Sequence, residues 1–150
     1  MPMKKLKDFL DKNKIDYVTI DHSPAYTAQE IAEVAHVSAK ALAKTVIVKI
    51  DGKLAIVVLP AHTKVDFDEL KKITGGKWVG LASEFEFEKR FPDCELGAMP
   101  PFGNLFNMDV YVREDLTKDK EIAFNAGTHS QLVKLAYRDF NKLVRPSVIH

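Results

Sequence analysis

The 150-residue sequence has little of what several classes of protein require. Its single cysteine, Cys94, cannot form an internal disulfide, and a lone thiol is typical of a reducing compartment. Its longest apolar run, residues 54–61, is far shorter than the roughly 20 residues that span a bilayer, and its N-terminus lacks a secretory h-region. We therefore expect a cytoplasmic protein with no membrane partner.

Neither sign of charge dominates, and no segment is repetitive or of low complexity. The 22 basic and 21 acidic residues leave a net charge of +1, which argues against a protein that coats nucleic acid but allows one that holds a short end. Apolar residues make up 46% and charged residues 29%, which is typical of a globular protein with a core. We therefore predict one domain over residues 1–150.

Several common catalytic motifs are absent as well. The sequence has no phosphate-binding Gly-x-x-x-x-Gly-Lys-Ser/Thr loop, no Gly-x-Gly-x-x-Gly segment and no nucleophile elbow around a serine. None of the five histidines pairs with another at a metal-ligand spacing, and one cysteine cannot build a thiolate site. We therefore expect no metal ion and no cofactor.

Hydrophobic periodicity predicts helices and strands without strict βαβ alternation, which is typical of an α+β fold. The clearest signal is a buried hairpin in which Asp51-Gly52 joins residues 45–50 and 54–59. Further strands are predicted at 17–21, 78–81, 108–112 and 121–124. Helices are predicted at 6–10, from the capping box of Thr27 and Glu30, from Ser38 through Ala43, at 65–73, from the capping box of Ser83 and Glu86, and from Thr128 or Ser130 to about Val144.

Lys44 is the first candidate functional residue, because it precedes an apolar strand face. Alternation places it with Val46, Val48 and Ile50, at the mouth of the predicted hairpin. A lysine there needs an anionic partner or a wet pocket, and a phosphate group would serve. The alternative is a side chain that extends from the strand end to the surface.

Two glycine-bearing segments are the next candidates. Residues 97–103, Gly-Ala-Met-Pro-Pro-Phe-Gly, form either a stiff loop that binds a carbonyl or developing oxyanion, or a plain surface turn. Residues 125–129, Asn-Ala-Gly-Thr-His, are predicted at the start of the last helix, where backbone N–H groups favour anions. His129 could then orient a water or move a proton, or it could simply be an exposed residue of an N-cap loop.

A basic stripe is the weakest candidate. Lys134, Arg138 and Lys142 recur at helical spacing in the last predicted helix, with Leu132 and Phe140 on another side. Such a stripe could contact a nucleic-acid backbone, although it is more often a solvated helix face.

Taken together, these segments resemble the YbaK and prolyl-tRNA synthetase editing-domain family of aminoacyl-tRNA deacylases. The resemblance is carried by residues 22–27 with Glu30, 43–48, 97–103 and 125–129, whose order and spacing agree from about His22 to Val144. In the late segment, His129 makes this sequence more similar to the synthetase-linked editors and the free-standing editors related to them than to the free-standing YbaK-type proteins. The resemblance implies a curved, mostly antiparallel sheet with helices outside it, and a free-standing enzyme that maintains translation fidelity by hydrolysing the ester of mischarged tRNA.

The resemblance also implies roles for individual residues. Lys44 would hold the 3′-terminal nucleotide through phosphate, backbone N–H groups of the loop that begins at Gly97 would engage the aminoacyl carbonyl, and His129 would position substrate or water. These three are the predicted catalytic residues. The predicted substrate-binding residues are His22, Tyr26, Thr27, Ala98, Met99, Pro100, Pro101, Phe102, Gly103, Asn125, Ala126, Gly127 and Thr128.

Two other functions remain open at this point. The same segments could form a non-catalytic module that binds the acceptor end of charged tRNA or a synthetase, or a regulator that binds a small molecule or nucleotide. The partner expected from the resemblance is the aminoacylated acceptor end of tRNA, with a synthetase as a further partner and no role for DNA.

Overall fold

A computed structural model of the chain describes residues 4–25, 27–38 and 40–150. Its helices are α1 (Lys4–Lys12), α2 (Ala28–Ala35), α3 (Phe67–Thr74), α4 (Glu84–Phe87), α5 (Glu114–Thr117) and α6 (Tyr137–Val144), with 3-10 turns η1 (Glu88–Arg90) and η2 (Gly103–Leu105). Its strands are β1 (Tyr17–Asp21), β2 (Ala43–Ile50), β3 (Lys53–Pro60), β4 (Val79–Leu81), β5 (Asp109–Arg113), β6 (Glu121–Asn125), β7 (Gln131–Ala136) and β8 (Ser147–Ile149). None of the helices in these residues is long and apolar enough to cross a membrane.

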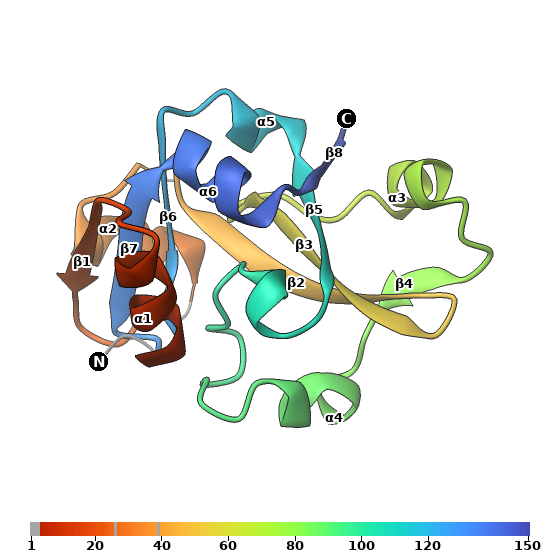
Figure 1. The fold of residues 1–150 in the computed structure, drawn as a ribbon, viewed down its shortest axis with the longest axis horizontal. Helices are drawn as coiled ribbons and strands as arrows, with labels where there is room; N and C mark the ends of the chain where they lie inside the picture. The colour runs from red at the N-terminus through yellow and green to blue at the C-terminus, as the bar shows by residue number, and fades with distance from the viewer. Residues whose placement is uncertain (1–3, 26, 39) are drawn as a thin grey trace.

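The strands form two sheets that meet at the start of β2. The larger sheet has the order β4-β2-β3-β5-β8 and the smaller one the order β1-β7-β6. A parallel bridge between Leu42 and Ala123 joins them, and the Ala123 N–H donates to the Ala41 carbonyl at 2.9 Å. Figure 1 shows the three strands of the smaller sheet gathered beside α1 and α2, with β4 and α3 at the opposite side of the molecule. The α+β prediction is therefore confirmed.

The predicted hairpin is also confirmed, and the conformation of its turn is determined by the two turn residues themselves. Asp51 and Gly52 have φ values of 50° and 86°, the two left-handed residues that a two-residue turn between twisted strands requires. β2 and β3 pair in register from Ala43–Pro60 to Ile50–Lys53. The Asp51 carboxylate also accepts from the backbone N–H groups of Lys77 and Trp78, both at 2.9 Å, so this turn fixes the entry to β4.

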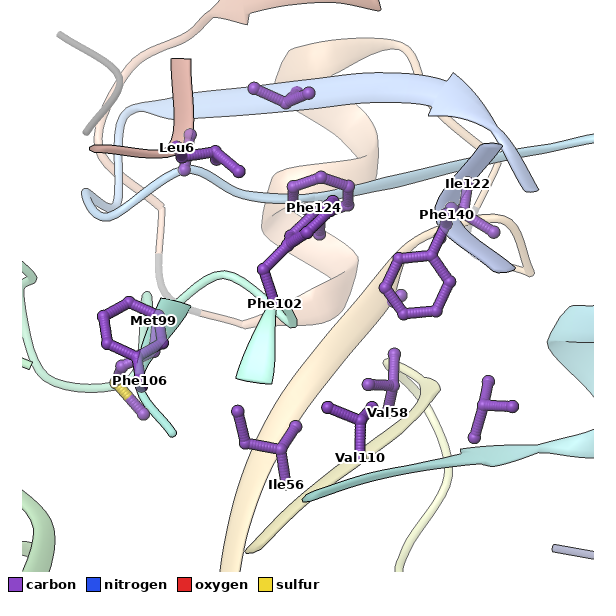
Figure 2. Close-up of a cluster of buried hydrophobic side chains, with 14 of the residues drawn as sticks. Leu6, Ile56, Val58, Met99, Phe102, Phe106, Val110, Ile122, Phe124 and Phe140 are labelled. Atoms are coloured by element: carbon purple, nitrogen blue, oxygen red, sulfur yellow. The ribbon is translucent and has the colours of Figure 1, made fainter. Parts of the chain in front are cut away.

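The main core lies between the two sheets, and a residue of the 97–103 loop, Phe102, lies at its centre. Phe102 is fully buried, and its ring centroid lies 5.4 Å from that of Phe124 and 5.5 Å from that of Phe140. Figure 2 shows these three rings together, with Ile56 and Val58 of β3 below them. Because aromatic rings bury large apolar areas, Phe102 anchors its loop to the body of the protein.

Two predicted helices are wrong. Lys40 and Ala41 form a turn and Ala43 begins β2, so the described residues between Ser38 and Ala43 contain no helix. Residues 131–136 are strand β7, because residues 131–135 pair with β1 and residues 132–136 pair with β6. The last helix therefore begins at Tyr137, and neither Thr128 nor Ser130 caps it.

The predicted basic stripe does not exist as a helix face. Lys134 lies in β7, whereas Arg138 and Lys142 lie in α6. Long-range strand pairing has overridden a local pattern that fitted a helix equally well.

The ion pair of Lys49 with Glu86 ties β2 to α4 and carries a pH prediction. Hydrogen bonding to Lys49, and then to the backbone of Ser83, lowers the pKa of Glu86 from 4.5 to about 2. A carboxylate with a depressed pKa stabilises the fold fully above its unfolded pKa and loses that stabilisation as pH falls through its folded value. We expect Glu86→Gln to be less stable than the wild type at neutral pH, and we expect the difference to shrink below about pH 4.5 and to approach zero as pH falls through about 2.

Urea unfolding across that pH range measures this effect. Glu84→Gln is the matched control, because Glu84 lies in the same helix and has no ion pair among the described residues. A stability difference for Glu86→Gln that stays constant from neutral pH to about pH 2 would contradict the assigned pKa of this pair.

Candidate functional site

Backbone hydrogen bonds join the two glycine-bearing segments, although about 30 residues separate them in the chain. The Glu95 N–H donates to the Gly127 carbonyl at 2.8 Å, and the Gly127 N–H donates to the Ala98 carbonyl at 2.8 Å. Segment 125–130 is the connection between β6 and β7, not a helix start, so the anion-binding argument from a helix N-terminus was wrong. What the segment does instead is hold the 97–103 loop in place.

His129 fixes this junction further. Its backbone N–H donates to the Glu95 carboxylate at 2.9 Å, and its Nε2–H donates to the Leu96 carbonyl, 2.8 Å away. Gly97 has a φ of +85°, and a Cβ there would lie 3.4 Å from His129 Cε1. Gly97 thus combines a left-handed backbone with close contact to an imidazole, two reasons for glycine at this position.

The segment that begins at His22 joins the same junction. The His22 N–H donates to the Ser130 carbonyl at 2.9 Å, and the Ala25 N–H donates to the His129 carbonyl at 3.1 Å. Thr27 is the N-cap of α2, where its hydroxyl accepts from the Glu30 N–H at 3.1 Å. Tyr26 lies outside the described residues.

A cavity of about 250 Å³ opens beside this junction. It brings together three of the residues that the sequence singled out, Lys44 from β2, Gly97 from the loop and Asn125 from the end of β6. Its complete lining is Ile31, Leu42, Ala43, Lys44, Thr45, Ala61, Gly97 and Asn125. His129 contacts the cavity through Gly97.

Lys44 makes this cavity electropositive. Burial lowers the pKa of Lys44, and the nearby charge of Lys64 lowers it further. Among the described residues, no carboxylate lies within ion-pair distance of its ammonium group. A half-buried cation without a counter-ion is costly, so the cavity favours an anionic ligand.

Two polar atoms behind the cavity add to this cost. Thr45 Oγ1 and Asn125 Oδ1 are buried, and neither has a hydrogen-bond partner among the described residues. Buried polar groups in folded proteins are nearly always paired, and exceptions gather at functional sites. Thr45 is one of the lining residues that sequence reasoning missed, although its place beside Lys44 was a usable signal.

Most of the 97–103 loop serves packing instead of lining the cavity. Its residues after Gly97 are buried, and Met99 and Phe102, predicted as pocket walls, belong to the main hydrophobic core. Ala126 belongs to that core too, while Gly127 takes a φ of +95° in the turn and the Thr128 hydroxyl lies 3.4 Å from that of Ser130. Among the predicted loop residues, the structure therefore places Gly97 and Asn125 at the cavity and the others around it.

A larger hollow of about 530 Å³ lies over β3 near the start of α3. It is lined by Val57, Leu59, Lys64, Val65, Asp66, Phe67, Asp68, Arg113, Ile149 and His150. Its lining contains Asp66 and Asp68 as well as Lys64 and Arg113, so the charges of these four residues balance, and it contains none of the residues that sequence reasoning singled out. We therefore assign the site to the smaller cavity, where an uncompensated cation meets two separate backbone turns.

Comparison with known proteins decides the family. A family model described as "Aminoacyl-tRNA editing domain" matches residues 22–143. This chain belongs to the aminoacyl-tRNA editing-domain family. The predictions of an editing-domain fold and of a function in aminoacyl-tRNA editing are thereby confirmed.

Individual relatives agree with this family. The chain is 28% identical over 143 residues to the prolyl-tRNA editing protein ProX of Acetoanaerobium sticklandii, covering 91% of this chain and 86% of ProX. It is 25% identical over 154 residues to the multifunctional Ser/Thr-tRNA deacylase ProXp-y of Escherichia coli, covering 98% of this chain and 90% of that protein. Among solved structures, the hypothetical protein APE2540 has the same fold, with a TM-score of 0.86, 22% identity and 97% coverage of both chains.

Proposed function

We propose that this editing-domain protein is a hydrolase that acts in trans, in the cytoplasm, on the ester between an amino acid and the terminal ribose of tRNA. The observation that carries the proposal is the meeting of the Lys44 ammonium, the Gly97 backbone and the Asn125 side chain around one cavity of about 250 Å³. The names of ProX and ProXp-y support it, because both describe proteins that act on aminoacyl-tRNA.

In this proposal Lys44 holds the phosphate of the 3′-terminal nucleotide. The ammonium group has no carboxylate to compete with that phosphate among the described residues. Charge-assisted hydrogen bonds to phosphate are short and strong, so one half-buried lysine is sufficient to anchor the end of the RNA. The near-neutral net charge of +1 fits a protein that holds only this end.

Gly97 supplies the candidate donor for the oxyanion. Of the loop's residues, Gly97 is the one that lines the cavity, whereas the Ala98 N–H is already bonded to the Glu95 carbonyl at 3.0 Å and prolines 100 and 101 have no N–H. The Gly97 N–H is held by the Met99 sulfur at 3.3 Å, and a thioether is a weak acceptor that a carbonyl oxygen displaces readily. An oxyanion donor of this kind is typically worth about 2.7–4 kcal/mol in the transition state.

In this proposal, water is the nucleophile, and the substrate itself provides the group that transfers the proton. Lys44 is the only titratable residue that lines the cavity among the described residues, so no carboxylate or imidazole there can act as a general base. Water adds to the ester carbonyl carbon, the ester bond to the ribose oxygen breaks, and the ribose oxygen takes up the proton. A neighbouring ribose hydroxyl relays that proton, and His129 acts as a positioning residue that keeps Gly97 against the substrate.

Deacylation of a panel of charged tRNAs tests the proposal. tRNAs carrying Ala, Pro, Ser, Thr or Cys are incubated with the wild-type protein, and the release of the labelled amino acid is followed. We expect release from at least one of them, because a cavity of about 250 Å³ admits small side chains. Binding of charged tRNA without any release would instead favour the non-catalytic module, and binding of free nucleotide alone would favour a regulator.

A further inference from the structure

β4 is an edge strand whose outer backbone groups have no strand partner. The Asp51 N–H donates to the Trp78 carbonyl at 2.8 Å, which fixes which residues turn their backbone groups toward β2. In an antiparallel ladder with the observed register, every second residue from Trp78 onward bonds to β2. Val79 and Leu81 therefore direct their N–H and C=O groups outward, where no described strand pairs with them. Such an edge is a template for a further strand.

Large apolar side chains surround this open edge. Trp78 is 81% exposed, Leu81 is 66% exposed and Phe85, in the following helix α4, is 83% exposed. Isolated exposed apolar residues are ordinary, but three in one short segment beside an unpaired strand are typical of an interaction surface. Figure 1 shows β4 and α4 on the side of the molecule away from β1, β6 and β7.

A hollow lies next to Trp78 along the same strand. It has a volume of about 490 Å³ and is lined in part by Lys49, Gly52 and Gly80. A Cβ built on Gly80 would meet nothing within 4 Å, so the space above this glycine is open. Trp78 and Gly80 are two residues apart in a strand and therefore share one face.

We infer that β4 pairs antiparallel with β4 of a second copy of this chain, about a two-fold axis through Gly80. In that register Val79 of each copy lies opposite Leu81 of the other, and their outward backbone groups exchange hydrogen bonds. Trp78 lies diagonally across from Gly80 of the second copy, so each indole occupies the hollow above that glycine. Lys77 of one copy reaches the start of α4 in the other, near Glu84.

The charges around the edge favour a second copy over RNA. Glu84 on α4 and Glu88 just after it repel a phosphate backbone, whereas Lys77 at the other end of the segment complements them across a two-fold axis. The area is also adequate. Two Trp and two Phe side chains supply roughly 600–1,000 Å² at roughly 150–250 Å² each, and the exposed Leu81 side chains and the paired backbones add to it, which brings the total to the roughly 1,000 Å² at which stable interfaces begin.

Two measurements on the whole chain test this pairing: its molecular mass in solution as a function of concentration, and its tryptophan fluorescence over the same range. Trp78 is the only tryptophan, so its emission reports on this surface alone. We expect a monomer–dimer transition between low micromolar and millimolar concentration, with a blue shift of the emission at the same midpoint. The test variant is Gly80→Glu, whose Cβ meets no atom within 4 Å in the monomer and whose carboxylates would lie directly opposite each other at the axis.

Val18→Glu is the matched control, because it adds the same charge at an exposed position of another edge strand, β1. Gly80→Glu should stay monomeric with unshifted emission at every concentration, while Val18→Glu should behave like the wild type. A wild-type chain that remains monomeric throughout overturns the inference. So does a dimer that Gly80→Glu leaves intact, or a monomer whose Trp78 emission responds only to added tRNA.

Discussion

Replacing Lys44 with alanine is expected to lower kcat/KM for deacylation by about 10- to 100-fold, the effect of losing a charge-assisted hydrogen bond worth about 1.5–3 kcal/mol to the phosphate of the substrate. The ammonium group is the only cation lining the cavity, and it has no carboxylate partner among the described residues. Lys44→Arg keeps the charge and should retain part of the activity. Single-turnover release of amino acid from charged tRNA measures the effect.

The stability of Lys44→Ala distinguishes a direct loss of activity from a loss caused by misfolding. Burial lowers the pKa of Lys44, so the folded chain holds its proton less tightly than the unfolded chain. The free energy of unfolding of the wild type therefore rises as pH increases through the folded pKa towards the unfolded value of 10.5. Lys44→Ala removes that charge, and we expect no loss of thermal stability at neutral pH.

Lys49→Ala is the matched control for position 44. Lys49 lies in the same strand on the opposite face, where its ammonium group pairs with Glu86. We expect this variant to lose some stability and keep its deacylation activity. Full activity in Lys44→Ala, or an equal loss in both variants, would contradict the role assigned to Lys44.

Gly103→Ala should cost stability more than any other small substitution in the loop. A Cβ at Gly103 would overlap the carbonyl oxygen of Met108 and the side chain of Val110. The Gly103 carbonyl also accepts from the N–H groups of Phe106 and Met108, each at 2.9 Å, so its backbone is not free to retreat. We expect a loss of about 3 kcal/mol in the free energy of unfolding, at the upper end of overpacking effects, measured by urea denaturation.

Gly97→Ala provides the contrast within the same loop. Its Cβ would only touch His129 Cε1, at 3.4 Å, and the main cost is a left-handed backbone with a φ of +85°. That cost is about 1 kcal/mol. We expect Gly97→Ala to fold and to lose deacylation activity, because the oxyanion donor shifts, whereas Gly103→Ala fails by unfolding. The reverse pattern would place the function elsewhere in the loop.

The elements that were predictable from sequence are those determined by neighbouring residues. Asp51-Gly52 specifies its hairpin because both residues accept a positive φ, and Ser83 with Glu86 specifies a capping box that the structure contains. β7 was not predictable in this way. Its apolar residues fit a helix as well as a strand, and only pairing with β1 and β6 decides between them.

The cavity, too, was only partly predictable from the sequence. Lys44 and Gly97 could be singled out by residue type, because a lysine at an apolar strand and a glycine in a proline loop each call for an explanation. The apolar walls Ile31, Leu42 and Ala61 come from three separate segments and carry no local signal. They meet because the Ala61 N–H donates to the Leu42 carbonyl at 2.8 Å and because Ile31 and Leu42 pack in one hydrophobic cluster.

The most direct measurement of the central claim is a crystal structure of this protein with a non-hydrolysable analogue, an adenosine 5′-monophosphate whose 3′ amino acid is attached through an amide in place of the ester. The account predicts the analogue in the 250 Å³ cavity, with its phosphate on the Lys44 ammonium and its carbonyl oxygen on the Gly97 N–H. An analogue bound instead in the 530 Å³ hollow beside α3, with Lys44 left facing solvent, would contradict it.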